Sequence, residues 1–260
     1  MAVERSSALV IGRFPLGESD RVVTFFTRRF GKVRGVAKAA RRVRSRFGSA
    51  LEPFTLGELV FFDNGRAELV QVDHFDIVRP FAGVREDLER LGQAAWMTEL
   101  VARLTADRDP NPAMFTLLAR ALAAVEGGAT PSRVAVLFGL RYVDLLGHRL
   151  RTDACVACGT GPVVADGIAG FDIAGGGTVC PRCVAALGGA FTVDAGSLGA
   201  LQRLRRASWD ESLRLPLGRA ESELRALLEA QVSGLIGQST RSARFLREVR
   251  RVSSVFEGSR

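Results

Sequence analysis

Residues 55–78 read TLGELVFFDNGRAELVQVDHFDIV, and this stretch carries the clearest local indication of a fold. Two apolar runs, Thr55–Phe62 and Arg66–Val78, flank Asp63-Asn64-Gly65. An Asn-Gly pair between apolar runs is typical of a β-hairpin, because both residues adopt the positive φ angles that tight hairpin turns require. The stretch therefore predicts two antiparallel strands.

Three further strands are predicted upstream, at Ser7–Arg13, Arg21–Arg28 and Lys32–Lys38. The first ends at the turn sequence Phe14-Pro15-Leu16-Gly17, and the second is rich in β-branched and aromatic residues. Alternation in the third stops at Gly35, where we expect a bulge or sharp bend. Five short strands in 80 residues favour a small closed barrel, because closure removes exposed sheet edges.

Basic residues are concentrated around the third of these strands. The 260-residue chain has 36 Lys+Arg, 28 Asp+Glu and a net charge of +8. Between positions 28 and 46 it has nine basic residues and no acidic one, so removing the nine from the 36 leaves 27 basic against 28 acidic groups. Such confinement of charge predicts a docking site for a polyanion, above all nucleic acid. The nine are Arg28, Arg29, Lys32, Arg34, Lys38, Arg41, Arg42, Arg44 and Arg46.

The alternative for this segment is a solvated or disordered basic arm. Apolar residues argue against a simple arm, because they interrupt the charges at Phe30, Val33, Val36, Val43 and Phe47. We expect Arg28–Lys38 to belong to the barrel, with Val33 and Val36 tying it to the core. We expect Ala39–Arg46 to be a mobile connection that supplies most phosphate contacts, chiefly from Arg41, Arg42, Arg44 and Arg46. Surface aromatic residues could stack bases, although most nearby phenylalanines are expected in the core.

From Pro80 onward the apolar spacing becomes helical. Helices are predicted at Gly83–Ala106, Ala113–Val125, Thr130–Gly147, Val193–Ala207, Arg219–Leu235 and Thr240–Val252. The segment Arg133–Leu146 is the most apolar of the first three and is expected to be central. The last helix carries arginines whose spacing spirals around it, which favours a solvated face. These are Arg241, Arg244, Arg247, Arg250 and Arg251.

All four cysteines of the chain lie in two C-x-x-C pairs, Cys155/Cys158 and Cys180/Cys183, with 21 residues between the pairs. Each pair can place two thiolates on one metal ion, and two pairs complete a tetrahedral shell of four sulfurs. Disulfides are disfavoured in a cytoplasmic chain, and a redox C-x-x-C needs only one pair. The pattern predicts one structural Zn²⁺ per chain, with no coordination position left for catalysis.

Several function classes are excluded or disfavoured. No apolar run reaches the 18 residues of a membrane span, and the N-terminus does not read as a secretory signal, so we expect a cytoplasmic protein without a membrane partner. Neither lysine, Lys32 or Lys38, lies in a phosphate-binding loop motif. His74 and His148 have no nucleophile at a recognisable spacing and are expected to be structural or surface residues. We therefore predict no catalytic residue and no enzyme.

The order of these features resembles that of the RecO family of bacterial recombination mediators over essentially the whole chain. The stretch Val36–Phe54, with its Phe-x-x-x-Leu-x-Pro-Phe ending, is similar to the basic segment of that family. Leu146-Gly147-His148, which leads into Cys155-x-x-Cys158-Gly159, is similar to the family's approach to its zinc knuckle. The fold class implied is a multi-domain α+β protein. An N-terminal OB-fold β-barrel at 1–80 precedes an α-helical domain at 81–260, which contains a four-cysteine zinc insert at about 152–188.

The resemblance also implies a function. It implies binding of single- and double-stranded DNA, annealing of complementary strands, and displacement of single-stranded DNA-binding protein for recombinase loading at the nucleoid. The implied partners are the RecR protein and the acidic, apolar C-terminal tail of single-stranded DNA-binding protein. The helix Arg133–Leu146 corresponds to the element that holds this tail, which makes Phe138, Arg141, Tyr142 and Leu145 candidate partner-binding residues.

Two other classes of function remain open from the sequence. A zinc-containing OB-fold module that binds RNA or the ribosome would share the barrel, the basic segment and the cysteines. A hydrolase acting on nucleic acid would need a divalent metal and clustered carboxylates, for which no motif is present.

Overall fold

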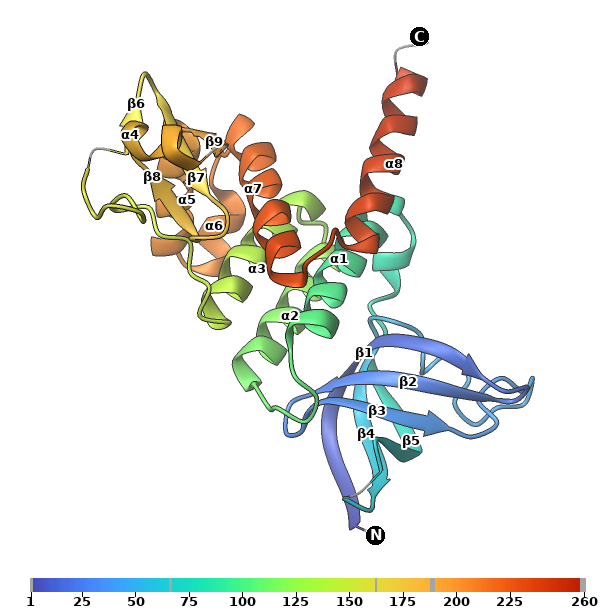
Figure 1. The fold of residues 1–260 in the computed structure, drawn as a ribbon. Helices are drawn as coiled ribbons and strands as arrows, with labels where there is room; N and C mark the ends of the chain where they lie inside the picture. Colours follow the sequence, from blue (N-terminus) through green and yellow to red (C-terminus); the bar gives the residue numbers. More distant parts are fainter. Residues whose placement is uncertain (1, 66, 162, 188–189, 258–260) are drawn as a thin grey trace. The chain divides into compact units, whose positions relative to one another are not determined.

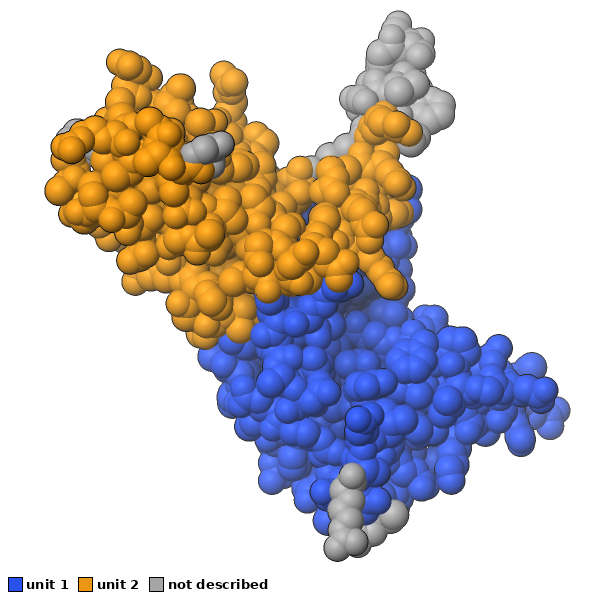
Figure 2. All heavy atoms as spheres, viewed as in Figure 1, with its two compact units in different colours: residues 1–127 blue, residues 128–260 orange. Residues whose placement is uncertain are grey.

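The structure is a computed structural model that describes residues 2–65, 67–161, 163–187 and 190–257 (Figure 1). It divides into two compact units, Met1–Gly127 and Gly128–Arg260, which we call unit 1 and unit 2 (Figure 2). The first two helices of the chain thus belong to the barrel's unit. The predicted domain boundary between residues 80 and 81 stays a prediction.

The five strands of unit 1 form a closed barrel, as expected (Figure 1). They join in the order β1-β2-β3-β5-β4, and β4 also pairs with β1. Every pair is antiparallel except β3 with β5. This order is that of the OB-fold, so the predicted fold of this part is confirmed. The strands are β1 (Ala2–Leu16), β2 (Asp20–Thr27), β3 (Gly31–Ala37), β4 (Leu56–Asp63) and β5 (Leu69–Arg79).

The hairpin predicted around Asn64-Gly65 is confirmed, with β4 and β5 antiparallel and residues 64–68 between them. The predicted turn after the first strand is displaced. Phe14, Pro15 and Leu16 pair with β2, so β1 continues to Leu16 and the chain turns at residues 17–19.

Strand β3 differs from the prediction at Gly35. Its register with β2 runs without interruption, so the expected bulge is wrong. A glycine is needed because a Cβ at this position would lie 2.7 Å from Val72 Cγ2 and 2.9 Å from Val70 Cγ2. The side chains therefore continue to alternate through Gly35: Val33 is buried in the barrel core, whereas Val36 is half-buried on the outer face. The expectation that Val36 faces the core is also wrong.

The segment between β3 and β4 contains no strand, as predicted, but it is a series of hydrogen-bonded turns rather than a free connection. The Arg42 N–H donates to the Ala39 carbonyl at 3.2 Å, and the Ser45 N–H donates to the Arg42 carbonyl at 3.0 Å. Four of its residues are buried in the barrel core: Ala40, Phe47, Ala50 and Leu51. Of the two apolar residues that the sequence indicated as interruptions in this segment, Phe47 is buried in the core and Val43 is fully exposed.

Two helices complete unit 1: α1 (Leu88–Leu104), preceded by the 3-10 turn η1 (Ala82–Arg85), and α2 (Pro112–Glu126). The start of α2 lies one residue from the predicted Ala113, whereas α1 begins five residues after the predicted Gly83, because η1 occupies the residues before it. Asp87 and Asn111 cap the two helices by accepting hydrogen bonds from backbone N–H groups of the first turns. The rings of Phe26 on β2 and Phe115 on α2 lie 6.2 Å apart, so α2 packs on the outside of the barrel.

Unit 2 is built around α3 (Pro131–Leu145), which packs against three other helices, as predicted for the central element. These are α5 (Ala195–Arg206), α6 (Trp209–Arg214) and α7 (Arg219–Ile236); α8 (Arg241–Glu257) ends the described chain. The glycine-rich insert forms a small antiparallel sheet (Figure 1). Its elements are β6 (Val164–Ala165), β7 (Ile168–Asp172), β8 (Gly177–Val179), α4 (Pro181–Val184), η2 (Ala185–Leu187) and β9 (Phe191–Asp194). Among the described residues, no helix combines the length and apolarity that crossing a bilayer would require.

The loop before α2 docks on the start of β3, and Gly31 makes this approach possible. Gly31 has φ +64°, and a Cβ there would lie 2.2 Å from the Asp109 carbonyl oxygen. We expect Gly31→Ala to lower the free energy of unfolding by about 2–4 kcal/mol, because left-handed strain adds to displacement of packed backbone. Gly17→Ala is the control: its φ is +57° with no atom within 4 Å, so strain alone should cost about 1 kcal/mol. Equal losses in urea titrations would contradict this role for Gly31.

Candidate nucleic-acid interface and metal centre

The nine basic residues do not form one cluster, because β3 separates them. Arg28 and Arg29 lie in the turn before β3, whereas Lys38 and the residues up to Arg46 follow its other end. A strand of this length spans about 20 Å at about 3.3 Å per residue. A single run in the sequence therefore supplies cations to two opposite ends of the barrel.

Lys32 is occupied by contacts inside unit 1. Its Nζ donates to the carbonyl oxygens of Ala102 at 2.8 Å and Thr105 at 2.7 Å, and it lies 3.2 Å from Asp107 Oδ1. These carbonyls end α1, where backbone acceptors have no partner within the helix. The side chain is only 13% exposed. The ammonium therefore binds a helix end, and we leave Lys32 out of the proposed DNA contacts.

The turns after β3 present exposed cations. The side chains of Lys38, Arg42 and Arg44 make no hydrogen bond and no ion pair with any residue that the structure describes, although the charges of Lys38 and Arg42 contribute to lowering the pKa of Asp20. The turns themselves are held by Asp20, whose Oδ1 accepts the Ala39 N–H at 2.8 Å. This hydrogen bond is the main reason that the pKa of Asp20 is lowered, and the Ser19 hydroxyl adds to it. Different residues therefore hold the turns and present the charge. Buried side chains and Asp20 fix the backbone, and the exposed guanidinium groups can contact a ligand.

The β1–β2 hairpin adds apolar surface beside these turns. Phe14 and Leu16 are 44% and 41% exposed, and the Arg34 guanidinium lies 5.9 Å from the centroid of the Phe14 ring. Arg41 joins the hairpin to the turns, because its NH1 donates to the Gly17 carbonyl at 2.6 Å. We call this region the hairpin surface; it comprises Phe14, Leu16, Arg34, Lys38, Arg41, Arg42 and Arg44.

Of the remaining predicted cations, Arg28 is exposed and its side chain makes no hydrogen bond or ion pair with the described residues, whereas Arg29 and Arg46 are less available. Arg46 lies 4.0 Å from Asp73 and 5.1 Å from the centroid of the Phe47 ring. Arg29 donates to the Arg5 carbonyl at 3.2 Å and lines a groove of about 580 Å³ with Arg108. That groove is also lined by three acidic residues, Asp63, Glu68 and Asp107. Arg108 forms an ion pair with Asp63 and lowers the pKa of that carboxyl. The groove is therefore of mixed charge, whereas the hairpin surface is cationic.

Sequence reasoning missed Phe14 and Leu16, because it assigned them to a turn. A signal was available in the strand period: once β1 is extended by pairing with β2, side chains at its end must alternate between faces. Phe14 then lies on the outer face of the barrel, near the C-terminal end of β1.

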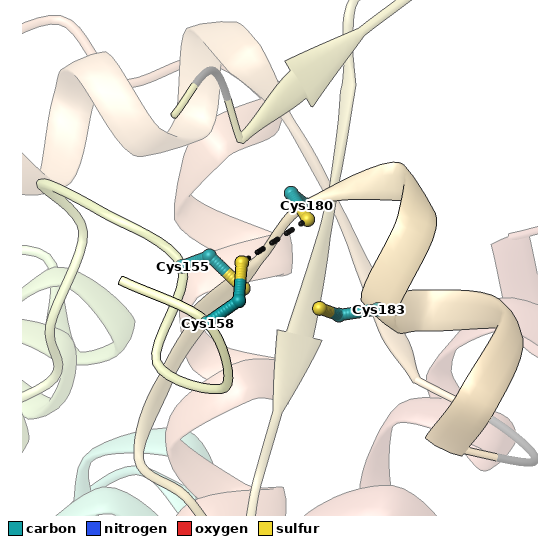
Figure 3. A group of neighbouring side chains, drawn as sticks. All are labelled: Cys155, Cys158, Cys180 and Cys183. Atoms are coloured by element: carbon teal, nitrogen blue, oxygen red, sulfur yellow. Dashed lines mark hydrogen bonds between the residues drawn. The ribbon is translucent and has the colours of Figure 1, made fainter. Parts of the chain in front are cut away.

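The four cysteines are brought together, as predicted (Figure 3). Their Sγ atoms all lie within 4.8 Å of one another, and those of Cys158 and Cys180 are 3.8 Å apart. A tetrahedral ion with metal–sulfur bonds of about 2.3 Å would separate its sulfur ligands by about 3.8 Å. The donor set and its spacing therefore fit a metal ion, which these four residues could hold.

Local backbone geometry aims the sulfurs inward (Figure 3). In the first pair the Gly159 N–H donates to the Cys155 carbonyl at 2.8 Å, and Gly159 has φ +75°. The second pair opens α4, where the Cys183 N–H donates to the Cys180 carbonyl at 3.0 Å. A small apolar core that includes Val156, Val179 and Val184 surrounds the group.

Electrostatics within the group favour a bound cation. The pKa of the Cys155 thiol is lowered to about 6, chiefly because its sulfur accepts a hydrogen bond from the Cys180 backbone. The pKa of the Cys183 thiol is raised to about 12, chiefly by the neighbouring sulfur of Cys158 and then by the other two. Four adjacent sulfurs cannot all be thiolates at neutral pH unless positive charge compensates them, and a metal ion supplies that charge.

The residues predicted to bind a partner tail on α3 are mostly internal. Phe138 and Tyr142 are completely buried and stack on each other with ring centroids 5.2 Å apart. Arg141 lies 5.4 Å from the centroid of the Trp209 ring and donates to the Ala207 carbonyl at 3.1 Å. Of the four, only Leu145 is exposed. The structure therefore does not form a tail-binding pocket from these side chains.

The C-terminal arginines were expected on a solvated face, and the histidines were expected to be structural or surface residues. Arg241, Arg244 and Arg247 are exposed on α8, and Arg247 lies 3.4 Å from Glu229; the Arg250 side chain lies outside the described atoms. His74 lies 3.0 Å from Asp73 and 3.6 Å from Asp76. In the described part of the chain, neither histidine hydrogen-bonds a serine, threonine or cysteine side chain.

Comparison with known proteins covers almost the whole chain. Residues 1–81 match the family model for the recombination protein O N terminal, and residues 85–244 match that for the recombination protein O C terminal. The DNA repair protein RecO of Anaeromyxobacter dehalogenans is 36% identical over 249 residues, which are 94% of this chain and 95% of that protein. Those of Frankia casuarinae and Syntrophus aciditrophicus are 39% and 28% identical, over 82% and 96% of this chain and 86% and 98% of their own.

The two lysines offer a direct test of how the basic run divides. We expect Lys32→Met to lower the free energy of unfolding by about 1–3 kcal/mol, because hydrogen bonds from an ammonium to the carbonyls of α1 are lost. Lys38→Met removes the same charge from an exposed residue and should change stability by less than about 0.5 kcal/mol. Urea titration of both variants measures the difference. A stable Lys32→Met protein would show that this ammonium is not needed by the fold.

Proposed function

The chain belongs to the RecO family of DNA repair proteins, and from this premise we propose that it binds single- and double-stranded DNA, anneals complementary strands and helps displace single-stranded DNA-binding protein for recombinase loading. Family membership supports a role in DNA repair and recombination. The finer activities rest on the hairpin surface, and we place them at the nucleoid in the cytoplasm.

The proposal rests chiefly on one observation: exposed cations lie on the hydrogen-bonded turns that follow β3. Annealing brings two polyanions together, so their mutual repulsion must be reduced, and a cationic surface does this without a covalent step. The side chains of Lys38, Arg42 and Arg44 form no ion pair with the described residues, so no such pair must break before they meet phosphates. Contacts to phosphate carry no sequence information, which suits a protein that must act on any sequence.

Phe14 supplies the second component of such a surface. Exposed aromatic rings stack with bases irrespective of sequence, and a guanidinium over the ring adds a cation–π contact. The Arg34–Phe14 pair lies on the outer face of the barrel strands that carry ligands in many OB-folds. We propose that a base stacks on Phe14 while its phosphates meet the turns after β3.

We further propose that Cys155, Cys158, Cys180 and Cys183 hold one structural Zn²⁺. Four thiolate ligands and tetrahedral spacing are typical of structural zinc, whose role is to stabilise the fold around it. Because all four positions are taken by sulfur, no position remains for substrate. Together with the histidines described above, this supports a protein that is not an enzyme.

The partners RecR and the tail of single-stranded DNA-binding protein are proposed on the family resemblance. The tail would be acidic and apolar; of the four candidate residues on α3, Leu145 is exposed and Arg141 is half-buried. A module that binds RNA or the ribosome is the alternative, and no relative quoted above supports it.

The hairpin surface is tested by paired charge removal. We expect Arg42→Gln/Arg44→Gln to weaken binding of single-stranded DNA and to reduce the slope of log K against log salt by about 1.4, since each lost phosphate contact contributes about 0.7. Arg28→Gln/Arg29→Gln removes the same charge from the other end of β3 and is the control. Fluorescence anisotropy across a salt series measures both, and equal losses would mean that only the total charge matters.

Phe14→Leu extends the same experiment, because it keeps an apolar side chain and removes the stacking face. Base stacking of this kind is worth about 1–3 kcal/mol, so affinity should fall at least about fivefold with an unchanged salt slope. Strand annealing should fall in parallel for DNA coated with single-stranded DNA-binding protein. Annealing of RNA but not DNA would favour the alternative function.

The zinc proposal is tested on the full chain by elemental analysis. We expect one zinc ion per chain. Cys158→Ser or Cys183→Ser should abolish zinc binding, and a strong chelator should remove the ion and cause a large loss of thermal stability. Thr160→Ala is the control, because its hydroxyl lies 3.0 Å from Cys158 Sγ without belonging to the donor set. A protein that folds with these cysteines reduced and no metal would overturn the assignment.

A further inference from the structure

Unit 2 contains a cavity of about 890 Å³ that belongs to neither the hairpin surface nor the metal centre. Its lining residues come from the chain that follows α3, from the turn between β7 and β8, and from the C-terminal half of α7. The side chains that matter for its chemistry are His148, Arg149, Arg151, Ile173, Gln231 and Leu235.

The charged residues lining the cavity are all basic. Leu150 is completely buried between the exposed residues Arg149 and Arg151, so the two arginines project to the side opposite Leu150. The chain is extended here, because the Arg151 N–H donates to Gly176 O and the Arg151 carbonyl accepts from the Thr178 N–H, both at 2.9 Å. Residues two apart in an extended chain lie about 6.6–6.8 Å apart, so the cations form a short row rather than a point.

Little within the protein neutralises this row. Arg149 makes no hydrogen bond or ion pair with any residue in the described part of the chain. Arg151 uses one N–H on the Gly175 carbonyl at 3.0 Å, and a guanidinium has five. No carboxylate of the described residues lines the cavity itself: Asp144 lies 3.2 Å from Arg205, Asp172 accepts the Ala174 N–H at 3.0 Å, and exposed Asp153 follows Arg151 by two residues outside the lining.

The other walls suit the body of a nucleotide. Ile173 and Leu235 are half-buried apolar side chains. The amide of Gln231 lies near Gly176, with Nε2 3.8 Å from where a Cβ would be, and its buried Oε1 accepts no hydrogen bond from the described residues. A ligand that combines spaced anionic groups, a flat apolar body and N–H donors would satisfy all these features. A single carboxylate would satisfy only one arginine.

We propose that this cavity is a second nucleic-acid site, which takes a short run of single-stranded DNA or RNA. Successive phosphates bind Arg149 and Arg151, a base lies against Ile173 and Leu235, and an N–H of that base donates to the Gln231 amide. This goes beyond the hairpin surface of the proposed function: annealing needs two strands, and two sites in one chain allow each strand to be held.

The site is tested with the full-length protein and oligonucleotides of DNA and of RNA that carry photoreactive thio-thymidine or thio-uridine. After irradiation and digestion, we expect cross-links to peptides that contain Ile173–Gly176 or Gln231–Leu235, in addition to the barrel. Arg149→Gln/Arg151→Gln should remove these cross-links, reduce the salt slope by about 1.4 and weaken binding by roughly tenfold or more. The matched control is Arg206→Gln/Arg214→Gln, which removes two exposed charges of unit 2 outside the cavity.

The outcomes separate this site from the hairpin surface. If Arg149→Gln/Arg151→Gln loses the cavity cross-links while Arg42→Gln/Arg44→Gln keeps full affinity, the cavity stands and the proposed hairpin surface fails. Cross-links confined to the barrel, with the cavity variant equal to its control, overturn the second site. If a labelled acidic peptide binds and the oligonucleotides do not, and Arg149→Gln/Arg151→Gln loses that peptide, the cavity is a protein-docking site and the nucleic-acid assignment is wrong.

Discussion

The two-residue period of β3 is the constraint on which the nucleic-acid side of this protein depends. Val33 and Ala37 are buried in the barrel core, and between them Val70 and Val72 leave no room for a side chain at Gly35. Lys32 and Arg34 must then face outward, where neighbouring elements decide their roles: a helix end takes Lys32, and an exposed ring lies beside Arg34. Two cations on the same face of one strand therefore have different surroundings: Lys32 binds a helix end, and Arg34 belongs to the hairpin surface.

Much of this could be predicted from the sequence, because the relevant signals are local. Asn64-Gly65 indicated the β4–β5 pair, the apolar spacing indicated helices where α1, α2 and α3 lie, and the two C-x-x-C pairs indicated a four-sulfur group. The predictions failed where tertiary contacts decide. Gly35 accommodates two valines of β5 rather than a bulge, and Phe138 and Tyr142 on α3 are buried by elements far away in the sequence. No local pattern distinguishes Lys32 from Lys38.

Several arginines of this chain hold its elements together. Arg205 bonds the Leu150 carbonyl and Asp144, Arg133 bonds Glu221, and Arg85 bonds the Thr55 hydroxyl. A count of basic residues would therefore overstate the binding surface. What distinguishes the hairpin surface and the cavity of unit 2 is that a buried backbone holds cations whose hydrogen-bonding capacity is still unused.

Strand β8 is only three residues long, yet it joins two sites. It starts at Gly177, beside the wall formed by Arg151 and Gly176, and it ends at Val179, next to Cys180. If an ion held by the cysteines also orders the Gly177 end of this strand, a ligand in the cavity binds more tightly to the metal-loaded protein. By thermodynamic linkage the ligand would then strengthen metal binding by the same factor. Metal occupancy would then set the affinity of a site that contains no metal ligand.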